Sequence, residues 1–417
     1  MPVELLLFDL DDTLLRTSDL EGFRGRQFVN QQPADYVHQL TAAFNADPFR
    51  VVYTQAQLLA IRRRFPEMRL GLFTRSPRTY ALTLLSLAYP NVAWETVVAF
   101  EDVNRTKPHG DGIHLAMRVS GVNSVSNVWL VGDGVVDIRA AYDAGCNCVL
   151  DMTTWPARHR PEDWRALERV PDAVIEDADD LEEVLDHSIN HLPAAERLQA
   201  VNGGEGLPGL RFEKTGYFNP LVEGNRPTYI HSLGRHFSGE APRRVAWHAV
   251  TNDIHRMKDL LVVPDYWIQA MRAFIRGMVI NRNPAGALAM SSVVITVVPA
   301  KPDRVQRLEA MLLQLAQSHA DAPIGRGAIA FIPRIMEYLP GALSHHSNGG
   351  LNRNQRFANV RDHLRVVADS GYARRHVVVI DDVVTSGASL IYADKYLREA
   401  GASDVTLLAL TKNVGIR

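Results

Sequence analysis

The chain of 417 residues contains only two cysteines, Cys146 and Cys148, with a single residue between them. Two cysteines this close cannot build a disulfide framework, and they lack the spacing of a structural zinc site. No apolar run approaches the roughly 20 residues that a helix needs to span a bilayer. The N-terminus has no basic segment ahead of its first apolar run, so we expect no signal peptide. These absences favour a cytoplasmic protein with no membrane partner.

A surplus of charge of one sign is also missing. The chain has 45 lysines and arginines against 47 aspartates and glutamates, which gives a formal net charge of −2. A near-neutral chain without a basic, aromatic-rich cluster is not expected to bind nucleic acid. Hydrophobic residues make up 46% of the chain, as in ordinary soluble globular proteins, and the length suffices for two or three domains.

The first apolar run, residues 4–10, has the continuous pattern of a buried strand and ends in acidic residues. Asp9 and Asp11 stand two positions apart at this end, and two such carboxylates can share a magnesium ion, which takes oxygen ligands. An aspartate can also attack phosphorus and form an aspartyl-phosphate, which divides phosphoester hydrolysis into two easier steps. A second acid nearby can protonate the leaving alcohol and then deprotonate the attacking water. The pattern therefore indicates phosphoester chemistry.

Three further segments carry groups that suit this chemistry. A predicted strand with the sequence LGLF is followed by Thr74, whose hydroxyl can hold a phosphoryl oxygen. Lys107, in the sequence Thr-Lys-Pro, can neutralise phosphate charge. Another predicted strand, VWLVG, is followed by Asp133 and, four residues later, by Asp137. Strands and helices alternate through this part of the chain, which predicts an α/β domain with a parallel sheet.

These four segments, in this order, resemble the motifs of the haloacid dehalogenase (HAD) superfamily of phosphatases. The resemblance implies a Rossmann-like, doubly wound parallel sheet and Mg²⁺ as the cofactor. The roles that it implies are those of nucleophile for Asp9, general acid and base for Asp11, donors to phosphoryl oxygens for Thr74 and Lys107, and magnesium ligand for Asp133 together with Asp9 and the backbone carbonyl of Asp11. Asp137 is expected to orient Lys107 or a metal-bound water, with a purely structural role as the alternative.

The chain between the first two motifs is short for a full helical cap. Residues 16–50 are polar and predict irregular structure, and one helix is predicted at Ala56–Phe65. We therefore expect a small cap and an open site, which suits a bulky substrate or one delivered from another domain. Arg24 and Arg26 are interpreted as surface arginines, with contact to a substrate phosphate as the alternative.

A second strand-end motif, VVVIDDVVTSGASL, occupies residues 377–390. Its branched apolar run predicts a buried parallel strand. Asp381 and Asp382 stand at the carboxyl end of this strand, where open α/β sheets bind ligands, and can accept hydrogen bonds from the two hydroxyls of a ribose. The hydroxyl-rich loop that follows precedes a predicted helix and offers donors to a phosphate. This order of parts suits a ribose that carries a 5′-phosphate.

The stretch resembles the phosphoribosyl pyrophosphate (PRPP) motif of type I phosphoribosyltransferases, and segments around it resemble their ComF-like branch. These segments are VVITVVPAKPDR at residues 293–304, NQRFANVRDHLRV at 354–366 and LREAGASDVTLLAL at 397–410. The resemblance covers roughly residues 285–417 and implies a second Rossmann-like, doubly wound parallel sheet. The PRPP-binding residues that it implies are Asp381, Asp382, Thr385, Ser386, Gly387, Ala388, Ser389 and Lys301. A solvated lysine is the alternative for Lys301.

The two resemblances divide the chain. The expected segments are a HAD-like hydrolase domain with a small cap at 1–187, a linker at 188–209, and a phosphoribosyltransferase-like domain at 210–417 with an irregular hood at about 210–285 and a core at about 286–417. Residues 343–354 are polar and contain glycine, as in a mobile loop that closes over a leaving group. Arg353 and Arg356 would then contact the diphosphate, with a plain flexible loop as the alternative.

The favoured interpretation is a bifunctional, Mg²⁺-dependent enzyme. The C-terminal domain would transfer 5-phosphoribosyl from PRPP to an acceptor, and the N-terminal domain would then remove a phosphate from the product. In a second interpretation, the C-terminal domain binds PRPP or a nucleotide without turnover and regulates the phosphatase. A third is a phosphatase that trims nucleic-acid ends, which the charge disfavours. The expected partners are PRPP and a phosphosugar or nucleotide-like phosphate ester, with a homodimer as a candidate assembly.

Overall fold

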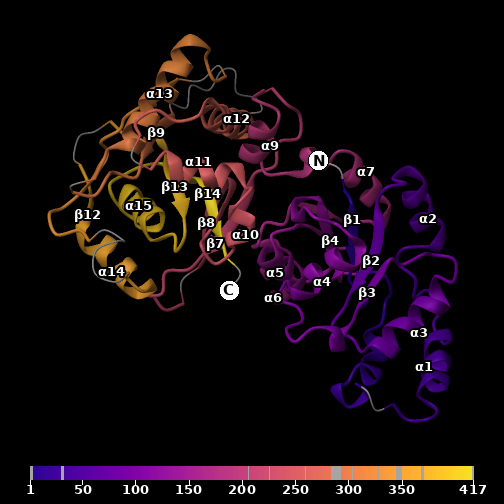
Figure 1. Ribbon diagram of the computed structural model, residues 1–417. Helices are drawn as coiled ribbons and strands as arrows, with labels where there is room; N and C mark the ends of the chain where they lie inside the picture. Colours follow the sequence, from indigo (N-terminus) through magenta and orange to yellow (C-terminus); the bar gives the residue numbers. More distant parts are fainter. Residues whose placement is uncertain are drawn as a thin grey trace. The chain divides into compact units, whose positions relative to one another are not determined.

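Two six-stranded sheets organise the chain in the computed structural model (Figure 1). Its contacts fall into two units. The first unit comprises Met1–Leu192, Phe237–His248 and Val414–Arg417, and the second comprises Pro193–His236 and Ala249–Asn413. The structure describes residues 3–29, 32–204, 206–224, 226–258, 260–282, 293–302, 304–325, 328–343, 350–367 and 371–415.

The first sheet has the strand order β3-β2-β1-β4-β5-β6, and its paired strands run parallel. Its strands are β1 (Leu5–Phe8), β2 (Arg69–Phe73), β3 (Thr96–Val98), β4 (Val128–Gly132), β5 (Asn147–Asp151) and β6 (Ala173–Ile175). The order runs outward in one direction from β1 and in the other from β4, so it reverses between these two strands. In open α/β sheets, ligands bind outside the carboxyl ends of the strands at such a reversal.

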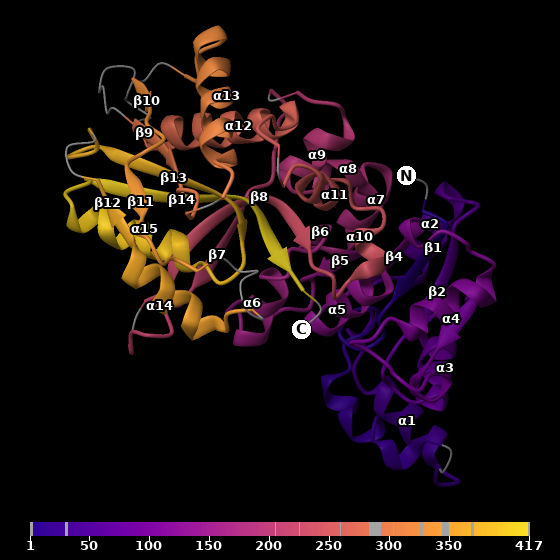
Figure 2. The same ribbon diagram turned by 60° about the vertical axis from the view of Figure 1, so that its left-hand side comes forward.

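Successive residues of β1 enter different hydrophobic cores. Leu6 and Phe8 lie in one buried cluster, whereas Leu5 and Leu7 lie in a second cluster. A strand covered on both faces needs apolar side chains at successive positions, which explains the continuous apolar run. Helices α1 (Tyr36–Asn45), α2 (Gln55–Arg64), α3 (Arg78–Ala88) and α7 (Leu181–Asp186) contribute to the first cluster, and α4 (Asp111–Ser120), α5 (Val135–Ala144) and α6 (Pro161–Leu167) to the second. Figure 2 labels these helices around the first sheet. The expected doubly wound parallel sheet is therefore present in the first unit.

The remaining short elements of this unit lie in its connections. They are the 3₁₀ helices η3 (Phe100–Asp102), η4 (Val125–Asn127) and η5 (Ala178–Asp180), and the helices α8 (Ser188–His191) and α10 (Pro242–Val245).

The chain between β1 and β2 is more regular than the sequence predicts. Two 3₁₀ helices, η1 (Ser18–Phe23) and η2 (Arg26–Phe28), precede α1 and α2. The prediction of irregular structure throughout residues 16–50 is wrong for α1. This helix buries Tyr36, Leu40 and Phe44, which are spaced four residues apart on one face. The stripe is short, and the positions between its members hold both polar and apolar residues, so the sequence does not show it clearly.

A buried arginine holds the same segment together. Arg50 is almost fully buried, and it donates to the carbonyl oxygens of Phe44 (3.1 Å) and Arg16 (2.8 Å). Its guanidinium also forms a two-pronged ion pair with Asp19, at 2.6 and 2.9 Å. This ion pair holds the pKa of Asp19 below its usual value. One side chain thus fixes the start and the end of the cap segment.

The second sheet has the order β10-β9-β13-β14-β8-β7 and is mixed. Its strands are β7 (Glu213–Tyr217), β8 (Thr228–Phe237), β9 (Val293–Val297), β10 (Ile329–Phe331), β13 (His376–Val384) and β14 (Asp404–Val414). Strands β10, β9, β13 and β14 pair in parallel, as predicted for the core of this domain, whereas β7 and β8 are antiparallel. The expectation of a wholly parallel sheet is therefore wrong for this unit, and its segment 210–285 is not irregular throughout.

This sheet, like the first, is covered on both faces. Val378 and Ile380 of β13 enter one buried cluster, and Val377 and Val379 enter another. Helices α9 (Ala194–Ala200), α11 (Ala249–Arg256), α12 (Asp265–Arg282) and α13 (Arg307–Asp321) contribute to the first of these clusters, and α14 (Arg353–His363) and α15 (Ala388–Glu399) to the second. A separate two-stranded sheet pairs β11 (Met336–Tyr338) with β12 (Leu364–Val366). Among the described helices, none is both long and apolar enough to cross a membrane.

An inserted segment of the chain contributes a buried ion pair to the first unit. Arg244, on α10, is almost fully buried and pairs with the equally buried Asp172. Its guanidinium also donates to the carbonyl of Cys146 (2.6 Å) and to Oδ1 of Asn147 (3.2 Å). The backbone N–H of Cys148 donates to the same Asp172 carboxylate, at 2.9 Å. These contacts tie residues 237–248 to the first sheet.

We expect Arg244→Ala to destabilise the first unit by about 3–5 kcal/mol, because the variant leaves the carboxylate of Asp172 buried without its cation. Urea unfolding followed by tryptophan fluorescence measures the change. The matched control is Arg243→Ala, which removes the exposed neighbouring arginine and should change stability by less than about 0.5 kcal/mol. Adding Asp172→Asn to Arg244→Ala should restore part of the loss. Equal unfolding midpoints for the two single variants would contradict this role.

Candidate functional site

An acidic cluster lies at the point where the strand order of the first sheet reverses. Asp9 directly follows β1, Asp133 directly follows β4, and Asp137 lies in the first turn of α5. One carboxylate oxygen from each lies within 4.8 Å of the others. The parallel sheet brings these residues together because both strands end at the same edge. Oxygen atoms this close, on three carboxylates, suit a hard divalent cation such as Mg²⁺.

Lys107 is the positive counterpart of this cluster. Its Nζ lies 2.8 Å from Oδ1 of Asp9 and 2.6 Å from Oδ1 of Asp137, and its side chain is fully buried. Burial alone would lower the pKa of this ammonium group, but the carboxylates of Asp137 and Asp9 outweigh burial and raise it. Lys107 therefore remains charged. Asp137 also accepts from the backbone N–H of Gly134 at 3.1 Å, so its side chain is fixed at both ends.

The two strand-end aspartates have strongly perturbed acidities. Burial is the main reason that the pKa of Asp9 rises from 3.8 to about 7; Lys107 opposes the rise, and Asp137 and Asp11 add to it. Burial likewise raises the pKa of Asp133 well above its usual range, with further contributions from Asp137 and Asp9. These carboxylates lie close together in a poorly solvated place, so a bound cation would stabilise their ionised forms.

Thr74 lies directly after β2, and its side chain is fully buried. Its Oγ1 accepts a hydrogen bond from the backbone N–H of Ser76 at 3.0 Å. The hydroxyl proton therefore remains the part of this group that can be donated to a phosphoryl oxygen. Asp9, Thr74 and Asp133 all line the same recess, whose volume is about 500 Å³.

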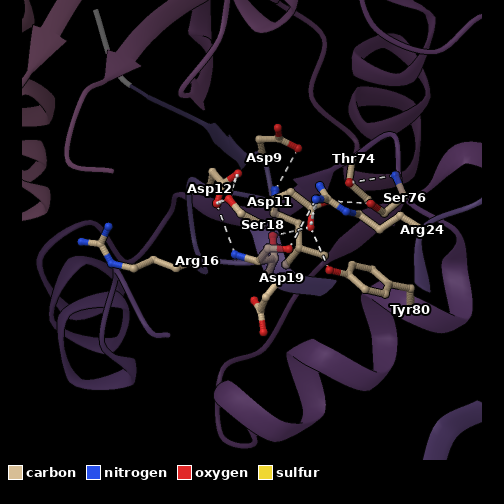
Figure 3. Close-up of polar contacts among 12 residues, drawn as sticks. Asp9, Asp11, Asp12, Arg16, Ser18, Asp19, Arg24, Thr74, Ser76 and Tyr80 are labelled. Atoms are coloured by element: carbon tan, nitrogen blue, oxygen red, sulfur yellow. Dashed lines mark hydrogen bonds and ion pairs between the residues drawn. The ribbon is translucent and has the colours of Figure 1, made fainter. Parts of the chain in front are cut away.

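The carboxylate of Asp11 is held by side chains of the cap segment, of the loop after β2 and of α3 (Figure 3). Its Oδ1 accepts from Thr17 Oγ1 (2.7 Å) and from Tyr80 on α3 (3.0 Å), and Oδ2 accepts from Ser76. Arg24 Nη1 approaches Oδ1 at 3.4 Å. Asp11 is therefore directed toward the cap segment and α3, and its carboxylate is not one of the three that surround the candidate metal site. Of the sequence-predicted metal ligands, the structure brings together the carboxylates of Asp9 and Asp133.

Several residues of this site were missed in the sequence. Ser76 and Tyr80 belong to the segment after the second motif. Ser76 stands two residues after Thr74, and this spacing is a sequence signal that points to Ser76. Trp155 donates from Nε1 to the carbonyl of Asp133 at 2.9 Å, and Thr154 donates to the carbonyl of Asp12. Both follow β5, in a loop whose sequence has no recognisable motif.

A second, smaller recess of about 140 Å³ lies in the second unit, beside the carboxyl end of β13. The structure brings most of the sequence-predicted PRPP-binding residues to its wall: Lys301, Asp381, Thr385, Ser386, Gly387, Ala388 and Ser389. Arg356 and Asn359, both on α14, also line it. Arg353 lies on the same helix and donates to the carbonyl of Phe218 at 2.7 Å. Part of the predicted loop at 343–354 falls outside the described residues, which resume at residue 350.

The loop before α15 is closely packed. Gly387 has φ +78°, a left-handed conformation that favours glycine, and a Cβ there would lie 3.1 Å from the side chains of Tyr217 and Ile230. Ser389 Oγ is 3.2 Å from the hydroxyl of Tyr338. Only a residue without a side chain allows the backbone to approach β7 and β8 this closely.

The two acids of this motif have different surroundings. Asp381 lines the recess, and burial raises its pKa from 3.8 to about 6, against the opposing effects of Arg307 and Lys301. Asp382 does not line the recess, and its carboxylate pairs with Arg307 at the start of α13. Lys301 donates to the carbonyl of Leu343 at 2.6 Å, and burial lowers its pKa. The prediction that both acids face one ligand therefore remains unsupported for Asp382 in this arrangement.

The raised pKa of Asp9 predicts a pH dependence of stability. Between 3.8 and about 7, the native protein holds a proton on Asp9 that the unfolded chain has released. The stabilising contribution is full below about 3.8 and is lost as the pH rises through about 7. In the presence of a metal chelator, urea unfolding should show this fall in stability between pH 4 and 7, and Asp9→Asn should reduce it because an amide does not titrate. The exposed Asp35→Asn control should keep the wild-type slope; an identical slope in Asp9→Asn would contradict the prediction.

Comparisons with known proteins give the same assignment for part of the chain. Residues 26–150 match the family described as haloacid dehalogenase-like hydrolase. No curated protein matches the chain. Among solved structures, a haloacid dehalogenase-like hydrolase from Bacteroides fragilis is 19% identical, with a TM-score of 0.33, over 43% of this chain and 99% of that one. CbbY from Rhodobacter sphaeroides, in complex with phosphate, is 20% identical, with a TM-score of 0.33, over 42% of this chain and 94% of that one. The N-terminal unit of the chain therefore contains a haloacid dehalogenase-like hydrolase domain.

Proposed function

We propose that the first unit is a phosphatase that works through an aspartyl-phosphate on Asp9. The observation that carries the proposal is the cluster of Asp9, Asp133 and Asp137 at the reversal of the strand order, with the buried Lys107 paired to Asp9 and Asp137. This arrangement concentrates the groups that phosphoryl transfer needs: a carboxylate nucleophile, a cation and a metal-binding oxygen set.

Asp9 is the nucleophile in this mechanism. Among the described residues, its contacts with Lys107 and with the backbone N–H of Leu10 fall on Oδ1, so Oδ2 is the oxygen that attacks phosphorus. As the new O–P bond forms, the bond from phosphorus to the alcohol oxygen breaks. Asp11 donates a proton to that leaving oxygen and becomes a carboxylate. In the second step, this carboxylate takes a proton from water, whose oxygen attacks phosphorus and releases phosphate and Asp9.

Two further side chains stabilise the charge that moves onto the phosphoryl group. Lys107 provides a fixed positive charge, and Thr74 provides its hydroxyl proton. Asp9 and Asp133 would hold Mg²⁺, which supplies charge neutralisation to the phosphoryl oxygens. Asp137 holds Lys107 in place, because it forms the shorter of the two ion pairs.

The test of this proposal is the Asp9→Asn variant. We expect it to lose at least about 10³-fold in kcat for p-nitrophenyl phosphate with Mg²⁺, because an amide cannot form the aspartyl-phosphate. Phosphate release measures the loss. Asp12→Asn is a matched control: Asp12 has φ +58°, which asparagine tolerates, so this variant should keep most of the activity. Hydrolysis at the wild-type rate by the Asp9→Asn variant would rule out Asp9 as the nucleophile.

We propose in addition that the second unit binds PRPP and transfers its 5-phosphoribosyl group. What supports this is the recess beside β13, where a hydroxyl-rich loop at the start of α15 faces the same space as Asp381 and Lys301. The loop would hold the 5′-phosphate, Asp381 would accept from a ribose hydroxyl, and Lys301 would meet the pyrophosphate. The phosphatase would then act on the phosphoriboside product. The competing function is a sensor that binds PRPP and regulates the phosphatase.

Asp381→Asn tests the second proposal. We expect the affinity for PRPP, measured by titration calorimetry with Mg²⁺, to fall about tenfold, the typical cost of losing a charged hydrogen-bond acceptor. Asp362→Asn is the control, since Asp362 is exposed and pairs only with its neighbour Arg361 among the described contacts. Unchanged affinity in Asp381→Asn would contradict the assignment. Binding without pyrophosphate release, in the presence of a metabolite extract, would favour the sensor.

A further inference from the structure

The recess above Asp9 is lined by side chains of both charges. The carboxylates of the proposed phosphatase site line it, and so do three arginines, Arg24, Arg26 and Arg75. Arg24 and Arg26 come from the cap segment, and Arg75 directly follows Thr74. A single phosphoryl group is already served by Lys107 and Thr74, so these three guanidinium groups exceed what that group requires.

Arg24 stands nearest to the catalytic residues. Figure 3 shows its guanidinium reaching between Asp11 and Thr74, whereas the side chain of Arg16 points away from them. Arg24 Nη2 donates to the carbonyl of Thr17 at 3.3 Å, and Nη1 lies 3.4 Å from Asp11. Its Nε is buried and has no hydrogen-bond partner among the described residues. The Nε–H group of Arg24 is therefore a hydrogen-bond donor that no described residue accepts from.

Arg26 and Arg75 differ from Arg24 in having no carboxylate to neutralise. Arg26 lies over the ring of Phe100, with 5.4 Å between its guanidinium carbon and the ring centroid. Both arginines are exposed, and neither forms an ion pair with a carboxylate in the part of the chain that the structure describes. Glu21, which is also exposed, is the acidic residue that the cap segment adds to the wall. Three arginines and one glutamate therefore join the catalytic carboxylates in this wall, and Arg24 is the arginine among them that approaches a carboxylate, that of Asp11.

Apolar side chains also line the recess, namely those of Val29, Pro77 and Phe100. Guanidinium groups pair best with planar or multidentate anions such as carboxylate and phosphate. A neutral alcohol portion would leave these groups without a ligand, and a polycation would be repelled.

We propose that the phosphatase substrate carries a second anionic group, a phosphate or a carboxylate, which Arg26 and Arg75 bind together with Arg24 while Asp9 attacks the ester phosphate. The apolar wall fits a short carbon body between the two anions. The inference rests on the proposed phosphatase function and names the substrate class of that site. For Arg24 and Arg26 it favours the alternative of the sequence analysis, contact with a substrate phosphate, over the interpretation as surface arginines.

Three esters with the same three-carbon body test the proposal: propyl phosphate, 3-(phosphonooxy)propanoate and propane-1,3-diol bisphosphate. We expect the wild-type protein, with Mg²⁺, to show a kcat/KM at least about tenfold higher for one or both of the two-anion esters than for propyl phosphate. The carboxylate and bisphosphate arms distinguish which second anion the arginines prefer. Because the contacts are exposed, Arg26→Gln and Arg75→Gln should each lower this ratio roughly three- to tenfold.

Arg16→Gln is the matched control, since it removes an arginine of the same segment that points away from the recess. It should leave the ratio unchanged. A wild-type ratio near one overturns the proposal, and so does a high ratio that Arg26→Gln and Arg75→Gln both leave intact.

Failure of the phosphatase proposal would give a different experimental result from failure of the second-anion proposal. If the wild-type protein hydrolyses none of the three esters, that function fails, and the substrate class is then tested by calorimetry with the Asp9→Asn protein. Tighter binding of a two-anion ester than of propyl phosphate, lost in the double variants with Arg26→Gln or Arg75→Gln, would support the recess as an anion site. Equal binding of all three esters would overturn it.

Discussion

The ion pairs of Lys107 are the interaction on which the first site depends. The three carboxylates lie close together and repel one another, and burial already favours the protonated forms of Asp9 and Asp133. A fully buried ammonium between Asp9 and Asp137 offsets part of this repulsion. In the proposed phosphatase mechanism, the same ammonium group also faces the phosphoryl group of the substrate. Hydrophobic packing on both faces of the sheet holds the strand ends that bear these charges.

The two units use their sheets in a similar way. In each, buried strands with apolar side chains on both faces end in acidic residues, and a loop with hydroxyl groups or glycine follows. Asp9 and Asp381 both have raised pKa values, and burial is the main cause in each case. The fold thus removes water from the carboxylate at each of these strand ends. A cation or a hydroxyl group of a ligand can take the place of that water.

The sequence predicted those parts of the site that belong to strand ends. Asp9, Thr74 and Asp133 were found because each follows a continuous apolar run, and a parallel sheet places such ends together. The hydrogen-bond donors to Asp11 were missed, because Thr17, Ser76 and Tyr80 come close to it only in the folded chain. The antiparallel pair β7 and β8 was missed as well, because its segment is rich in glycine, proline and polar residues. The ion pair between Asp382 and Arg307 joins residues 75 positions apart in a way that no local pattern encodes.

The insertion of residues 237–248 into the first unit makes the chain path interlaced rather than serial. The chain leaves the first unit after residue 192, returns to it on α10, and ends in it again after β14. Cutting the chain once therefore cannot release either unit intact. A fragment that ends at residue 192 would keep every residue of the proposed phosphatase site, yet it would leave Asp172 without Arg244 and would uncover the face of Tyr142 that packs against Phe237. The first unit is thus completed by sequence that follows residues 193–236 of the second unit, so producing the first unit alone would require residues 237–248 as well.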